Sequence, residues 1–200
     1  MPTISLTDFV DFVVGVGPTK LTKVREIKRR KKYKYRFDHW RELREGIVVF
    51  HAEAARDKKQ YFDQLLDGLD EQKQSSYRPL VANYKSFLGR KQITSNPVER
   101  TTWTYKQLKV NINPELALTI NNKPYLLKLY FKAAELTKSR VDVILLLIKH
   151  AMPHVDGVTY GLLDVHHNRL YDAAPQDRLL PLLHGEADNF LTMWNEIGDI

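Results

Sequence analysis

The chain has 200 residues, of which 43% are hydrophobic, so it can bury the core of one large domain or two small ones. It contains no cysteine, which excludes disulfides, thiolate metal sites and cysteine nucleophiles and suits a reducing compartment. The net charge of +7 is uneven, because residues 1–100 hold 21 Lys and Arg against 13 Asp and Glu, whereas residues 101–200 hold 10 against 11. Such an asymmetry is typical of a protein whose first half meets a polyanion.

The first half is expected to be mostly helical. Apolar residues recur every three or four positions in four segments, at about residues 6–13, 40–54, 61–69 and 80–88. Glycines follow several of these segments closely, as expected where helices end. Within the second segment, Ile47-Val-Val-Phe50 is also typical of a strand, but the wider spacing favours a helix.

The period changes to two after residues 96–97. Alternating apolar residues predict strands at 103–112, 116–120 and 124–131, and a phase slip near Gln107 suggests a bulge in the first. Asn121-Asn122 fits a two-residue hairpin turn, because Asn tolerates the positive φ that such turns require. These strands are therefore expected to form one sheet.

The chain then predicts a helix that is apolar almost all round at residues 141–148, so we expect it to pack across the sheet and to be buried. A strand at 158–165, a short strand at 170–173 and an amphipathic helix at 179–194 complete the chain. The fold class expected is α+β, with a helical N-terminal half. We divide the chain into a helical, basic region at 1–95 and an α/β core with a closing helix at 96–200, which could form one continuous domain.

The hairpin turn also predicts a register that places Glu115 opposite Lys128. Side-chain alternation then gives one apolar face, which includes Val110 and Leu116, and one polar face. The simplest interpretation of the polar face is that it is solvated and that Glu115 and Lys128 form an ordinary cross-strand ion pair. The residues assigned to the polar face are Asn111, Asn113, Glu115, Thr119, Lys128, Tyr130 and Lys132.

The αβββαβ order expected over residues 80–165 resembles the core of the PD-(D/E)XK nuclease-like fold. In that family an acid after a proline and an acid-x-lysine trio lie on facing strands, the acids hold a divalent cation, and the lysine assists the attacking water. Pro114-Glu115 matches the first element. The trio falls on Lys128-Leu129-Tyr130, or on Tyr130-Phe131-Lys132 after a two-residue slip.

The resemblance implies a catalytic role for Glu115, Lys128 and Lys132, with Glu115 as a metal ligand. Neither register supplies the second acid, and Asp142 and Glu99 are the nearest substitutes. We therefore expect the cleavage activity to be lost and no cofactor to be required. Mg²⁺ or Mn²⁺ would be needed only if the chain were an active nuclease.

A strongly basic segment, KLTKVREIKRRKKYKYRF, covers residues 20–37 and holds ten basic residues and one acid. Closely spaced cations can displace counterions from phosphates, and interleaved aromatic rings can pack on bases. The alternatives are a solvated surface or a nuclear-localisation signal. The candidate nucleic-acid-binding residues are Lys28, Arg29, Arg30, Lys31, Lys32, Tyr33, Lys34, Tyr35 and Arg36.

The favoured hypothesis is a nucleic-acid-binding protein, with DNA preferred to RNA, on a nuclease-like core that no longer cleaves. One alternative is an active divalent-metal-dependent nuclease, and another is a protein-interaction module whose basic segment meets an acidic partner. The N-terminal stretch carries acids where a secretory signal would carry Lys or Arg, and the longest apolar run, at 143–148, is too short to cross a bilayer. We therefore expect a cytoplasmic protein without a membrane partner, and a nuclear location stays open.

Overall fold

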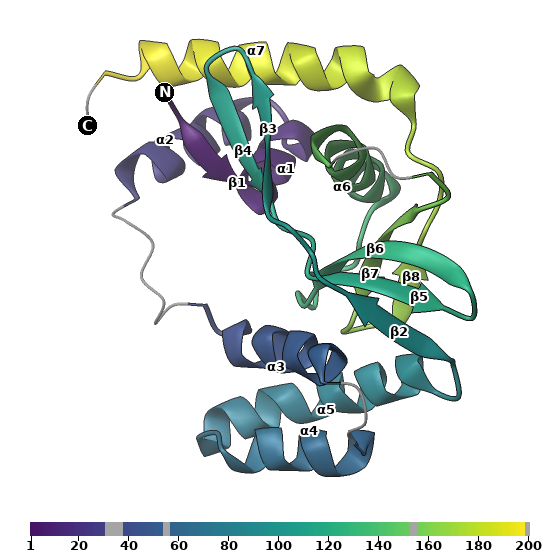
Figure 1. The fold of residues 1–200 in the computed structure, drawn as a ribbon. Coiled ribbons are helices and arrows are strands. Elements are labelled where there is room, and N and C mark those ends of the chain that lie inside the picture. The colour runs from purple at the N-terminus through teal and green to yellow at the C-terminus, as the bar shows by residue number, and fades with distance from the viewer. Residues whose placement is uncertain (31–37, 54–56, 153–155, 199–200) are drawn as a thin grey trace.

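The computed structural model describes residues 1–30, 38–53, 57–152 and 156–198 and has an α+β fold with two mixed β-sheets (Figure 1). The first half is mostly helical, as predicted. Its helices are α1 (Leu6–Val14), α2 (Pro18–Arg29), α3 (Arg41–Ala52), α4 (Lys58–Asp67) and α5 (Glu71–Leu88).

Side-chain caps explain where three of these helices begin. The Ser5 hydroxyl accepts a hydrogen bond from the backbone N–H of Asp8 at the start of α1, and Asp57 and Asp70 cap α4 and α5 in the same way. Each cap satisfies a backbone N–H group that has no partner within its helix.

The first sheet has three strands and includes the N-terminus. Its strands are β1 (Thr3–Ser5), β3 (Thr101–Tyr105) and β4 (Leu108–Ile112), in the order β1-β4-β3. β1 runs parallel to β4, and β3 runs antiparallel to it. The predicted bulge near Gln107 is wrong, because Tyr105 pairs with Leu108 and Lys106 takes a positive φ of 49° in a two-residue turn. The phase slip in the sequence marks the change from one strand to the next.

The second sheet has five strands in the order β2-β5-β6-β7-β8. β6 is antiparallel to β5 and parallel to β7, and helix α6 makes the crossover between β6 and β7. The bounds are β2 (Ile93–Asn96), β5 (Leu116–Ile120), β6 (Lys123–Tyr130), α6 (Lys138–Ala151), β7 (Thr159–Asp164) and β8 (Arg169–Tyr171).

The prediction of a single sheet is therefore wrong. β5 lies between β6 and β2, a strand that was not predicted, whereas β4 pairs with the N-terminal strand β1 on one side and with β3 on the other. Val110 and Leu116, which were expected on one face, belong to different hydrophobic clusters. The predicted turn is confirmed, since Asn121 and Asn122 have positive φ values of 48° and 68°.

Two hydrophobic clusters hold these layers together. The first joins α1, α2, α6 and the closing helix α7 (Leu180–Glu196, after the short 3-10 turn Asp177–Leu179) to the first sheet and to one face of the second. The second cluster packs α3, α4 and α5 on the other face of the second sheet. Each cluster draws on both halves of the chain, so the cores do not separate at residue 95.

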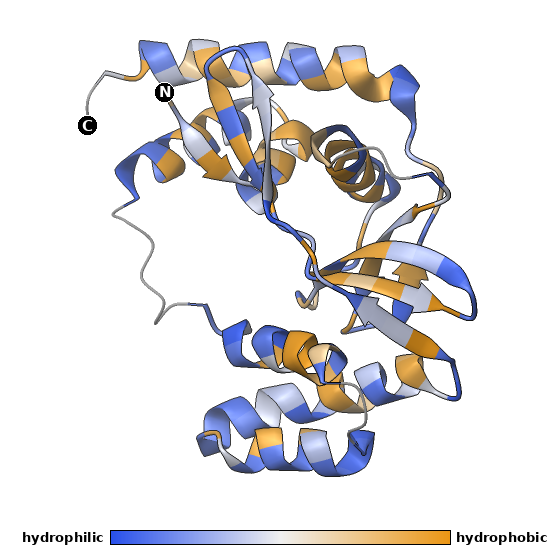
Figure 2. Ribbon diagram, in the orientation of Figure 1, coloured by the Kyte–Doolittle hydropathy of each residue, from blue (hydrophilic) through white to orange (hydrophobic). Residues whose placement is uncertain are grey.

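Helix α6 lies between the two sheets, and its central residues are buried as predicted. Val141 and all residues of the run 143–148 are buried, and the helix contacts both β3 and β7. Figure 2 shows the hydrophobic character of this helix along most of its length. Among the residues that the structure describes, no helix combines the length and hydrophobicity needed to cross a bilayer.

Candidate nucleic-acid interface

Glu115 and Lys128 form a polar pair at the open end of the β5–β6 hairpin. Leu116 pairs with Leu127, which confirms the predicted register. The Nζ of Lys128 donates to the Glu115 carboxylate and, at 2.9 Å, to the backbone oxygen of Asn113. The second carboxylate oxygen accepts a hydrogen bond from the backbone N–H of Leu129 at 2.8 Å. Both oxygens of Glu115 are thus used within the protein.

This pair is largely withdrawn from solvent, because the side chains of Glu115 and Lys128 are only 10% and 19% exposed. Leu126 and Ala117, which point to the same side of the sheet, pack in the cluster that contains α6. The expectation of a solvated polar face is thus confirmed only in part: Asn111 and Lys132 are exposed, and the other residues assigned to it are partly exposed. Part of this side of the sheet packs instead in the hydrophobic cluster that contains α6.

The residues around Glu115 do not fit a divalent metal ion. A lysine ammonium occupies the position beside the carboxylate, where a cation would be repelled and a second acid is needed. Asp142, one expected substitute, pairs with Lys138 at 2.6 Å on α6. Within the described residues there is no group of three or more His, Asp or Glu side chains placed to hold a metal.

Lys132 is separated from this pair. Its nearest carboxylate is Asp11 of α1, at 3.9 Å, and its side chain is 51% exposed. Asp11 already binds Arg140 at 2.5 Å and Lys23 at 3.4 Å. The structure thus brings together two of the three predicted catalytic residues, Glu115 and Lys128, and directs the third toward α1.

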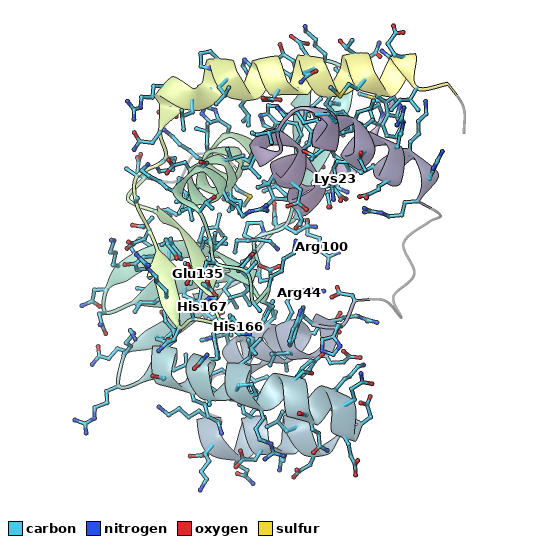
Figure 3. All side chains as sticks on the ribbon, turned by 180° about the vertical axis from the view of Figure 1, so that it is seen from behind. Lys23, Arg44, Arg100, Glu135, His166 and His167 are labelled. Carbon is cyan, nitrogen blue, oxygen red and sulfur yellow. The ribbon has the colours of Figure 1, made fainter. Side chains whose placement is uncertain are left out.

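A large cleft connects these residues. It has a volume of about 1700 Å³, and Glu115, Lys128 and Lys132 all line it, together with α3, β2 and the segment that leads into β3. In Figure 3, Arg44 and Arg100 lie between the upper and lower groups of helices, and both line this cleft. Ligand pockets for small molecules usually measure roughly 300–1,000 Å³, so this cleft suits a larger ligand.

Cations outnumber acids in the cleft lining, but several of them are already paired. Arg44 binds Asp38 at 2.6 Å and Arg41 binds Glu45 at 2.8 Å. Arg100 is exposed and makes no side-chain hydrogen bond or ion pair within the described part of the chain. The lining cations are Arg41, Arg44, Lys58, Lys91, Arg100, Lys128 and Lys132, and the acids are Asp38, Glu45, Glu53, Asp57 and Glu115.

His51, which also lines the cleft, adds no charge at neutral pH. Burial lowers the pKa of His51 from 6.5 to about 4. One ring nitrogen lies 2.5 Å from the hydroxyl of Tyr84, a fully buried residue of α5. The neutral ring therefore ties the end of α3 to α5.

Three of the predicted basic-segment residues lie in the described part of the chain. Lys28 donates to the backbone oxygens of Trp194 (3.0 Å) and Ile197 and so holds the end of α7. Arg30 donates two hydrogen bonds to Asp8, at 2.8 and 3.1 Å. Arg29 is exposed. The other predicted residues lie outside the described residues: Lys31, Lys32, Tyr33, Lys34, Tyr35 and Arg36.

The Arg30–Asp8 contact has a clear electrostatic effect. Burial by itself raises the pKa of Asp8, but hydrogen bonds from Arg30, Ser5 and Lys23 outweigh it, and the net pKa is lowered. A carboxylate that is 6% exposed is thus kept ionised by its partners. The charge of Arg30 is therefore used within the protein, where it stabilises the ionised Asp8 carboxylate.

The α3 side of the cleft was not predicted from the sequence. Val48 and Val49 are 36% and 42% exposed there. The signal was present in the run Ile47-Val-Val-Phe50, which holds more large apolar residues than one face of a helix can bury. No sequence pattern around Arg100 indicated that this residue would line the cleft.

Comparisons with known proteins add no further constraint. No family model matches the chain, and no curated protein or solved structure matches it. The function is therefore inferred from the geometry.

Proposed function

We propose that the protein binds nucleic acid, DNA in preference to RNA, in this cleft, on a nuclease-like core that has lost metal-dependent cleavage. The observation that carries the proposal is the position of the Glu115–Lys128 pair. Glu115 follows Pro114 and directly precedes β5, Lys128 lies on the adjacent strand β6, and both line a cleft large enough for a polymer. An enzyme of the PD-(D/E)XK type would hold its metal at such a position.

The order of the elements supports the nuclease-like core. From α5 to β7 the chain forms a helix, the strands β2, β5 and β6, the helix α6 and the strand β7, with the β3–β4 hairpin inserted after β2. β2, β5, β6 and β7 lie side by side in that order, and only the last pair is parallel. This arrangement resembles the αβββαβ core expected from the sequence.

The contacts of Lys128 support the loss of cleavage. Catalysis of this type needs at least two hard oxygen ligands on one cation, which polarises the phosphate and lowers the pKa of the attacking water. Here the second position is a lysine, and its ammonium satisfies the charge of Glu115. The pair can stabilise the hairpin, but it offers a divalent cation no free carboxylate.

The charge distribution supports a polyanionic ligand. Arg100 and Lys132 expose their charges at the cleft, and the sequence between Arg30 and Asp38 adds four cations without an acid. Asp38 itself lines the cleft, so this basic run leads directly to it along the chain. Cations gathered at a concave surface raise the local concentration of a polyanion.

A pair of serine variants tests the proposal. In the first, Lys31, Lys32, Lys34 and Arg36 become serine; Arg30 is kept because it binds Asp8. In the control, four exposed cations outside the cleft become serine, so the net charge falls equally. The control residues, whose side chains have no hydrogen bond or ion pair within the described residues, are Lys59, Arg78, Lys109 and Arg178.

The measurement is fluorescence anisotropy of a labelled DNA duplex at several salt concentrations. The first variant should bind more weakly, and the slope of log K against log salt should flatten by about 0.9 for each phosphate that the variant no longer neutralises. The control variant should keep most of the affinity and the wild-type slope. If both variants behave like the wild type, the basic run is a solvated surface and contributes nothing to the binding of a polyanion.

A further inference from the structure

We propose that the cleft takes single-stranded DNA, with the bases against α3 and the phosphates against Arg100 and Lys132. This inference rests on the proposed function and specifies its ligand. It follows from a chemical difference between the two sides of the cleft.

The α3 side presents hydrocarbon to solvent. Val48 and Val49 are two of only five large hydrophobic residues that are exposed in the described part of the chain, and they are neighbours on the cleft wall. Ala52, one turn further along α3, is exposed as well and also lines the cleft. Such a surface gains free energy when a flat apolar ligand covers it.

The charges on this side are largely compensated. Arg41 pairs with Glu45 within α3, and Arg44 pairs with Asp38 just before the helix. The α3 wall is therefore close to neutral, and its most available contacts are the two valines. Such a wall suits base faces better than phosphates.

The other side of the cleft is polar and positive. Arg100 is exposed and makes no side-chain ion pair within the described residues, and Lys132 is half exposed with one long contact to Asp11. Thr7, at the start of α1, adds an exposed hydroxyl group. Cations and hydroxyls are the groups that proteins use to bind phosphate oxygens.

A single strand matches both sides at once, whereas a duplex matches only one. A duplex keeps its base faces stacked inside and presents phosphates and sugars outward, so exposed valines would gain little from it. A single strand exposes base faces on one side and phosphates on the other. A ribose 2′-hydroxyl held against hydrocarbon would lose its hydration without gaining a partner, which favours DNA over RNA.

Two double variants separate the two sides. Val48→Ala with Val49→Ala removes the apolar contacts and retains the helix, because alanine has a higher helix propensity than valine. Arg100→Ser with Lys132→Ser removes the phosphate contacts. Val16→Ala with Leu182→Ala is the matched control, since both residues are exposed and lie outside the cleft.

The probes are a labelled 20-nucleotide mixed-sequence DNA strand, its duplex and the RNA strand of the same sequence, each titrated at several salt concentrations. For the single DNA strand, the valine variant should raise Kd about five- to tenfold at every salt concentration with an unchanged salt slope, because apolar contacts release no counterions. The Arg100/Lys132 variant should flatten the slope by about 1.4, at about 0.7 for each phosphate. The control should match the wild type.

The wild-type protein should bind the single DNA strand more tightly than the duplex or the RNA. Equal or tighter binding of the duplex, or an unchanged affinity of the valine variant, would overturn this inference and leave the proposed function standing. Absence of binding to all three probes would instead overturn the proposed function itself. Binding of an acidic peptide in place of all three would assign the cleft to a protein partner.

Discussion

Replacing Lys128 with methionine tests the ion pair that stands at the centre of the site. Methionine keeps most of the hydrocarbon stem but removes the ammonium, so Glu115, at 10% exposure, retains only the backbone N–H of Leu129 as a donor. The backbone oxygen of Asn113 also loses its partner. Removing one member of a fully buried pair costs about 3–5 kcal/mol, whereas a surface pair contributes at most about 1 kcal/mol.

The burial of this pair lies between those limits, so we expect Lys128→Met to lower the free energy of unfolding by about 2–3 kcal/mol. For a chain of this length about 1 kcal/mol corresponds to roughly 2–4 °C, so the melting temperature should fall by about 5–10 °C. Urea denaturation of Lys128→Met, Glu115→Gln and the double variant completes a double-mutant cycle. The double variant should be more stable than the sum of the single changes predicts.

A loss below about 0.5 kcal/mol in Lys128→Met, or strictly additive losses in the cycle, would refute the reasoning. Either result would mean that the two side chains are solvated independently. The stability of the hairpin would then not depend on their pairing. The Lys128 ammonium would also not take the place of a divalent metal ion beside Glu115.

Two further predictions concern His51 and the glycines. The folded pKa of His51 is about 4 against an ordinary 6.5, so the unfolded chain binds more protons between these values, and stability should fall as the pH is lowered through this window. His51→Gln should remove about 2–3 kcal/mol of that pH dependence in urea melts from pH 7 to pH 4, and an unchanged dependence would contradict the burial. Gly161→Ala should destabilise by about 1–3 kcal/mol, because its Cβ would lie 2.5 Å from a methyl carbon of the buried Leu127. Gly185 is exposed within α7, and a Cβ there would have nothing within 4 Å, so Gly185→Ala should stabilise the protein by about 0.5–1 kcal/mol. Equal effects of the two glycine changes would show that packing at residue 161 is loose.

Features set by neighbouring residues could be predicted from the sequence. The turn at Asn121-Asn122, the facing of Glu115 and Lys128 and the burial of the run 143–148 all follow from local periodicity and turn chemistry. Each depends on residues within one hairpin or one helix. The folded chain keeps these local features because they do not depend on contacts with distant segments.

Features set by distant segments could not be predicted. The pairing of β1 with β4 joins residues more than one hundred positions apart, and β2 is too short and polar to be recognised as a strand. A run of positive charge likewise does not reveal its partners. Lys28 and Arg30 were expected to face a polyanion, whereas they bind the end of α7 and Asp8.

The cleft also depends on tertiary structure, because its sides come from α3, β2 and β6. Only packing brings Val48 and Arg100 to one concave surface. The sequence indicated the chemistry available in each segment. The folded chain shows which segments share the cleft.

The most direct test of the central claim measures binding and cleavage in the same tubes. Labelled DNA, single-stranded and duplex, is titrated with the wild-type protein and with Glu115→Ala in Mn²⁺ buffer, anisotropy gives Kd, and a denaturing gel then shows whether the DNA is intact. We expect both proteins to bind the DNA and to leave it uncut. Cleavage by the wild type that disappears in Glu115→Ala would identify an active nuclease, and absence of binding by the wild type even at low salt would contradict the account altogether.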